Sequence, residues 1–187
     1  MKTPVIVRRA KNQPTPAKRL SVKLKAKKLN LPPPPAPKQI GGEDRRKGVK
    51  IMVALHSTLS GEFASRFDNV IRDNVRVKYM GQTRGREGDV RYNFTSTESD
   101  QHTQLPIHHQ SVVKLQPTMS WRGSRVAARC TCRDWTYRCE VVWSKRSAAL
   151  EPMTSNGEPP IRTNPTNHLF CCKHLIVIFN RLLKSNQ

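Results

Sequence analysis

The sequence contains two pairs of side chains that can bind a metal ion. One pair is in Cys130-Thr131-Cys132, and the second follows about forty residues later in Cys172-Lys173-His174. In an extended strand, side chains two residues apart point to the same side, so Cys130 and Cys132 can reach one ion together. Three thiolates and one imidazole form a Cys3His set that fills the four positions of tetrahedral zinc. The spacing predicts a structural zinc site, because a filled shell leaves no position for water or substrate.

The third ligand has two candidates. Cys171 and Cys172 are adjacent; one residue separates Cys172 from His174 and two separate Cys171 from it. We choose Cys172 and keep Cys171 as the alternative. The remaining cysteine, Cys139, is interpreted as a core residue, because it shares one face of a predicted strand with Tyr137, Val141 and Trp143.

The thiols are expected to be reduced. The first residues of the chain lack the apolar run of about 7–15 residues that is typical of a secretory signal. Reduced thiols favour metal binding over a framework of disulfides.

The charge of the chain is strongly positive and unevenly distributed. Lys and Arg number 34 against 13 Asp and Glu, which gives a net charge of +21. Residues 1–50 contain 15 basic and 2 acidic residues, so they contribute +13 and the rest contributes +8. A segment of this kind repels itself and stays extended until an acidic partner neutralises it. No apolar run approaches the roughly 18 residues that a membrane span needs, so we expect a soluble protein with no membrane partner.

Residues 1–48 are predicted to form an extended basic arm. Residues 21–27 alternate apolar and basic side chains with the period of a strand, and the prolines of residues 32–37 predict a stiff polyproline spacer. Gly41-Gly42 then offers a flexible joint, and a disordered tail is the alternative interpretation of the whole arm. The residues predicted to bind a partner are Val22, Lys23, Leu24, Lys25, Lys27 and Lys28.

Residues 49–187 are predicted to form one globular α+β domain. The hydrophobic pattern places a helix at residues 61–73 after an N-cap at Ser60, and another helix at residues 172–183. A hairpin is predicted from the strands at 125–132 and 136–143, which with the last helix makes a β-β-α zinc module of residues 124–183. Further strands are expected at residues 75–79, 90–95 and 112–116, and loops at residues 82–89 and 144–167.

The ligand pattern resembles a known family. Cys130-x-Cys132-x-Asp134-Trp135, followed after a long insertion by Cys172-Lys173-His174-Leu175, resembles the SWIM-type zinc finger. Within this region the run Ser155-Asn156-Gly157-Glu158-Pro159-Pro160, together with Asn164-Pro165, is similar to small virion structural proteins of tailed bacteriophages. The chain departs from that family at residues 167–171, where a Pro-Gly turn more often precedes the third ligand. The resemblance covers about one third of the chain, residues 124–183.

This resemblance implies a structural component of a phage particle. We expect it in the virion, in the tail, baseplate or neck, where the arm would link neighbouring subunits through their acidic surfaces or sheet edges. The zinc would be structural, and the partners would be other virion proteins rather than small-molecule substrates.

A nucleic-acid-binding zinc finger or a ribosome-associated basic protein is the first alternative. Basic arms beside zinc fingers neutralise phosphates through Lys and Arg. Residues 81–86, which are rich in Gly and Arg, could touch phosphates, and Trp121 or Trp135 could stack on bases. No recognition-helix or RNA-platform motif accompanies them, so a solvated loop and core aromatic residues are the favoured interpretation.

An enzyme is the second alternative. His102, His108 and His109 are the candidates for acid–base chemistry, but they lie in a polar stretch without a nucleophile motif or paired carboxylates. We interpret them as surface loop histidines and expect no enzymatic activity.

Overall fold

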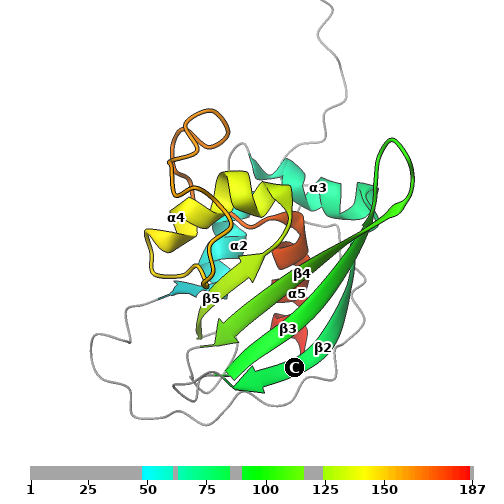
Figure 1. The fold of residues 1–187 in the computed structure, drawn as a ribbon, viewed down its shortest axis with the longest axis horizontal. Helices are drawn as coiled ribbons and strands as arrows, with labels where there is room; N and C mark the ends of the chain where they lie inside the picture. Colours follow the sequence, from blue (N-terminus) through cyan, green and yellow to red (C-terminus); the bar gives the residue numbers. More distant parts are fainter. Residues whose placement is uncertain (1–47, 61–62, 85–89, 116–123, 186–187) are drawn as a thin grey trace, which may run out of the picture.

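The computed structural model describes residues 48–60, 63–84, 90–115 and 124–185. These residues form an α+β fold, as predicted, in which helices cover one face of a five-stranded antiparallel sheet (Figure 1). The predicted arm and the partner-binding segment within it lie outside the described residues. The order of the strands is β1-β5-β4-β3-β2, with β1 at Val49–Lys50, β2 at Arg76–Arg84, β3 at Val90–Ser99, β4 at Pro106–Leu115 and β5 at Arg125–Cys130.

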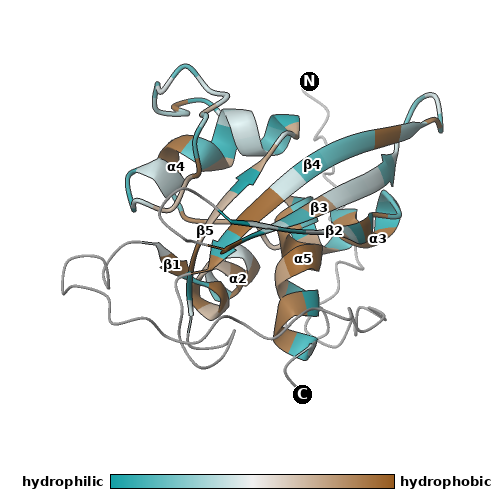
Figure 2. Cartoon of the chain, turned by 60° about the horizontal axis from the view of Figure 1, so that its bottom comes forward, coloured by the Kyte–Doolittle hydropathy of each residue, from teal (hydrophilic) through white to brown (hydrophobic). Residues whose placement is uncertain are grey.

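The helices lie against the apolar face of the sheet. Helix α5 (Lys173–Lys184) is buried along most of its length, and α2 (Ile51–Leu59) and α3 (Ser65–Arg72) pack beside it. Figure 2 shows the apolar residues of α2 and α5 beneath the strands. None of the helices in the described part of the chain is long and apolar enough to span a membrane.

The strands show the alternation that a sheet with one covered face requires. In β3, Tyr92, Phe94, Ser96 and Glu98 are buried, while the residues between them are partly exposed. Glu98 therefore points to the covered side, toward the start of α5.

The predicted hairpin is wrong. Residues 135–139 form one π-helical turn (Trp135–Cys139), which leads directly into α4 (Glu140–Ser144). A second strand has no free edge to pair with, because β5 lies between β4 and β1 and also bridges through Ala128 to Ala149. The helical form also buries Trp135, Cys139 and Trp143 together, whereas Tyr137 is 64% exposed and is not part of the predicted core face.

Other boundaries differ from the prediction. Helix α2 was not predicted, and Ser60 ends it instead of starting the next helix, because the Ser60 backbone N–H donates to the carbonyl of His56. Strand β2 continues to Arg84 into the predicted loop. His108 and His109 lie in β4 and not in a loop.

Candidate metal centre

The ends of two elements bring the four predicted ligands together. Cys130 is the last residue of β5 and Cys132 follows it, while Cys172 is the N-cap of α5 and His174 lies in its first turn. One ligand atom from each residue lies within 4.8 Å of the others, and all four residues are buried. The two pairs of residues, about forty apart in the sequence, therefore lie next to each other in the fold.

The spacing of the donors suits a tetrahedral ion. The Sγ of Cys130 lies 3.7 Å from Nδ1 of His174. With Zn–S near 2.3 Å and Zn–N near 2.0–2.1 Å, a tetrahedral ion separates such a pair of atoms by about 3.6 Å. The four side chains could thus hold a metal ion with little rearrangement.

Cys171 and Cys139 lie outside this group. Cys171 faces α2, where its backbone N–H donates to Thr58 Oγ1 at 2.9 Å. Burial raises the pKa of the Cys171 thiol to about 12 and that of Cys139 well above its usual value. Both behave as core thiols, and of the two candidates for the third ligand it is Cys172 that joins the other three residues.

The four side chains of the group shift one another's pKa values. Burial opposes charge on Cys130, but its contacts with Cys132, Cys172 and His174 hold the pKa of Cys130 well below the ordinary value. The contact with Cys130 raises the pKa of Cys132 to about 11, and burial raises that of Cys172. Burial lowers the pKa of His174, but contacts with Cys130, Cys132 and Glu98 outweigh it and raise that pKa to about 11. Among the three thiols, Cys130 is therefore the one that ionises most readily, and the neighbouring His174 favours its protonated form.

A carboxylate orients the imidazole from behind. His174 Nε2 lies 3.1 Å from Glu98 Oε2, which leaves Nδ1 directed at Cys130. Glu98 also accepts from His109 Nε2 at 3.2 Å and pairs with Lys173, whose Nζ contacts Asp73 Oδ2 at 2.5 Å. Burial opposes ionisation of Glu98, but these partners outweigh it and hold the pKa of Glu98 below its ordinary value. Metal-bound histidines commonly donate their second N–H to such a carboxylate, which fixes the ring.

A backbone hydrogen bond also fixes one of the sulfur atoms of the group. The backbone N–H of Trp135 donates to Cys132 Sγ at 3.3 Å, from the first turn of the helical segment that replaces the predicted hairpin. A surface hollow of about 680 Å³ lies beside the group, and its wall includes Cys132, His109 and Lys173. Of the four donor residues, Cys132 is the one that lines this hollow.

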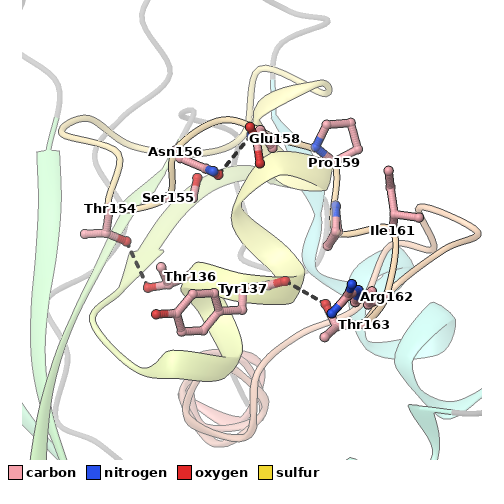
Figure 3. A pocket seen from close by; sticks show the side chains of 11 residues that line it. Thr136, Tyr137, Thr154, Ser155, Asn156, Glu158, Pro159, Ile161, Arg162 and Thr163 are labelled. Carbon is pink, nitrogen blue, oxygen red and sulfur yellow. Dashed lines mark hydrogen bonds between the residues drawn. The ribbon is translucent and has the colours of Figure 1, made fainter.

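The long loop after α4 is tied to the same region by Glu140, which is fully buried. Its carboxylate accepts from Trp135 Nε1 at 3.1 Å and from the backbone N–H groups of Thr154 at 2.9 Å and Ser155 at 2.5 Å. The motif at residues 155–160 then lines a hollow of about 580 Å³ (Figure 3). Thr163 also lines this hollow, and its hydroxyl donates to the carbonyl of Tyr137 at 2.8 Å.

The other candidates from the sequence are not brought to this centre. Trp135 is fully buried, so it cannot stack on bases, and Trp121 lies outside the described residues. His102 and His108 are exposed, and only His109 approaches the group, with its ring 4.6 Å from that of His174.

Sequence reasoning missed Glu98, because the strand was predicted to end at residue 95. The sequence contained a signal for it: Glu98 continues the alternation of buried residues that begins at Tyr92 and Phe94.

Comparisons with protein-family models, with curated proteins and with solved structures found no match to this chain. The chain is thus defined by its own site: an α+β domain with a buried Cys3His group that could hold a metal ion. The resemblances to SWIM-type fingers and to phage virion proteins stay predictions.

Proposed function

We propose that Cys130, Cys132, Cys172 and His174 bind one structural zinc ion. The observation that carries this proposal is the convergence of four buried donors, all within 4.8 Å of one another. Three thiolates and an imidazole are ligands that zinc prefers, and together they fill its coordination shell. The ion would join the end of β5 to the start of α5 and so hold the intervening helical segment and loop in place.

We further propose that the chain is a structural component of a tailed-phage virion, in the tail, baseplate or neck. The sequence motif at residues 155–160 and the Cys-Lys-His-Leu run support this proposal. The hydrogen bonds from Thr154 and Ser155 to Glu140 also support this proposal. They fix the start of the loop that carries the motif, so the loop can present a constant surface to a neighbouring subunit. In this role the zinc would keep a small domain rigid, while Val22, Lys23, Leu24, Lys25, Lys27 and Lys28 bind acidic surfaces or sheet edges of neighbouring subunits.

Metal analysis of the folded protein tests the zinc site. We expect one zinc per chain, loss of zinc in Cys130→Ser and Cys172→Ser, and retention of zinc in Cys171→Ser. The Cys171 variant is the matched control because its thiol is equally buried but lies outside the group. Full stability of the wild-type protein in strong chelator, with no metal detected, would contradict the proposal, since binding energy at such a site is also folding energy.

Mass spectrometry of purified virions, separated into heads and tails, tests the assembly role. We expect the chain in the tail fraction at a fixed copy number. Absence from both fractions, with recovery on host nucleic acid or ribosomes, would contradict it.

A further inference from the structure

The sheet has a second face that no helix of the described residues covers. Tyr92, Phe94, Val113 and Leu115 point toward α2 and α5, so the residues between them point away. In Figure 1 this open face is toward the viewer and α5 lies behind the strands. The open face is formed by the outward residues of β2, β3, β4 and β5.

Positive charge collects on the open face. The register places Arg91 opposite Lys114, and the next outward residue of β4, Val112, lies opposite Arg129. The only carboxylate in β2–β5 is Glu98, which points to the covered side. Six cationic side chains from four strands therefore share one surface without an acidic residue of these strands among them: Arg76, Lys78, Arg91, Lys114, Arg125 and Arg129.

The remaining outward side chains indicate the kind of partner. They are mostly hydrogen-bonding groups such as Asn93, Thr95, Thr97 and Gln110, and they include no Phe, Tyr or Trp. Single-stranded nucleic acids are bound mainly by stacking bases on aromatic side chains. Lys, Arg, Thr, Asn and Gln instead contact phosphates and sugars along a duplex, where they position the protein without reading sequence.

We propose that the open face binds the phosphate backbone of duplex DNA. The partner is chosen by charge complementarity, because a row of phosphates is a regular polyanion that a cationic face of this size can contact at several points. The arm, residues 1–48, adds a net charge of +12 from 14 basic and 2 acidic residues, so it would strengthen the same attraction. This inference is independent of the virion proposal and uses different side chains from the proposed zinc site.

Fluorescence anisotropy of the full-length protein with a labelled duplex tests the proposal. The face variant carries Arg76→Gln, Lys78→Gln and Arg129→Gln. The control variant carries Lys145→Gln, Arg162→Gln and Lys184→Gln, which remove the same charge from exposed positions outside the sheet. The arm is present in every protein compared, so its contribution cancels.

We expect the face variant to lower the slope of log K against log salt by up to about 2.7, since each lost phosphate contact lowers it by about 0.9. The control variant should change the slope by less than about 1, and two duplexes of unrelated sequence should give the same result. Zinc content and circular dichroism of both variants should match the wild-type protein.

Equal weakening by both variants would overturn the proposal, because the attraction would then be general. Unchanged binding by the face variant would assign DNA binding to the arm alone. Absence of binding by the wild-type protein, or face-dependent binding that is tighter to single strands or duplex RNA, would also overturn it. None of these outcomes bears on zinc stoichiometry or on recovery from virions, so the proposed function can fail or stand separately.

Discussion

Replacing Glu98 by Gln isolates the contribution of the carboxylate behind His174. The substitution keeps the size of the side chain but removes the negative charge that contacts His174, His109 and Lys173. Loss of a carboxylate that orients a metal-bound histidine typically lowers metal affinity 10–100-fold. That factor corresponds to about 1.4–2.7 kcal/mol of binding free energy.

Competition with a chromophoric zinc chelator measures this effect in the folded protein. Glu158→Gln is the matched control, because it makes the same chemical change in the exposed loop. We expect a 10–100-fold weaker zinc affinity for Glu98→Gln and no change for the control. Equal affinities in the two variants would refute the orienting role of Glu98, even with zinc bound by the four ligands.

The same carboxylate predicts a pH dependence of stability. The contacts of Glu98 hold its pKa below the ordinary value of 4.5. The unfolded chain therefore binds a proton more readily, so the stability due to Glu98 is present above pH 4.5 and is lost as the pH falls further. Denaturant titrations between pH 3 and 7 should show a steeper acid loss for the wild-type protein than for Glu98→Gln.

Three further perturbations test other parts of the structure. Zinc binding near pH 7 should release about three protons, one each from His174, Cys132 and Cys172, so affinity should rise about 1000-fold per pH unit. That slope should persist to pH 9, whereas thiols with an ordinary pKa of 9.0 would flatten it, and competition titrations across this range distinguish the two. Glu140→Ala should cost about 3 kcal/mol or more, because it leaves the buried indole N–H and two loop amides without their acceptor, and thermal unfolding beside Glu158→Ala measures it. Deleting residues 1–40 should leave a zinc-loaded domain that no longer joins its assembly; normal incorporation of the truncated protein would show that the arm is dispensable.

The sequence was sufficient to predict which four metal-binding side chains come together, because that prediction depends on residue type and short spacing. The strand that ends at Cys130 and the helix that begins at Lys173 both have clear hydrophobic periods. Two ligand pairs at the ends of these elements can meet without knowledge of the intervening chain. Periodicity also predicted most strands and the α+β class.

The segment after Cys132 could not be predicted in this way, because its alternation fits a strand and a helix equally well. Tyr137, Cys139, Val141 and Trp143 have the period of a strand, while Trp135, Cys139 and Trp143 are also four residues apart. Tertiary structure decides between strand and helix here. The second strand of the predicted hairpin would have paired with the edge of β5 that β1 and Ala149 occupy. Glu140 was missed for the same reason: the backbone N–H groups that donate to its carboxylate lie in a loop more than ten residues away.

The proposed zinc centre and the proposed DNA surface use opposite sides of the same strands. In β5, Cys130 points to the metal group and its neighbour Arg129 points to the open face; in β3, Glu98 and Thr97 are divided in the same way. Because adjacent residues of a strand face opposite sides, substitutions of outward cations leave the metal donors untouched. Loss of the proposed zinc would have no such restriction, since it would release the end of β5 and with it the position of Arg129. Charge variants would therefore report on the open face alone, whereas chelation would perturb both surfaces. Only the charge variants can assign DNA binding to the sheet.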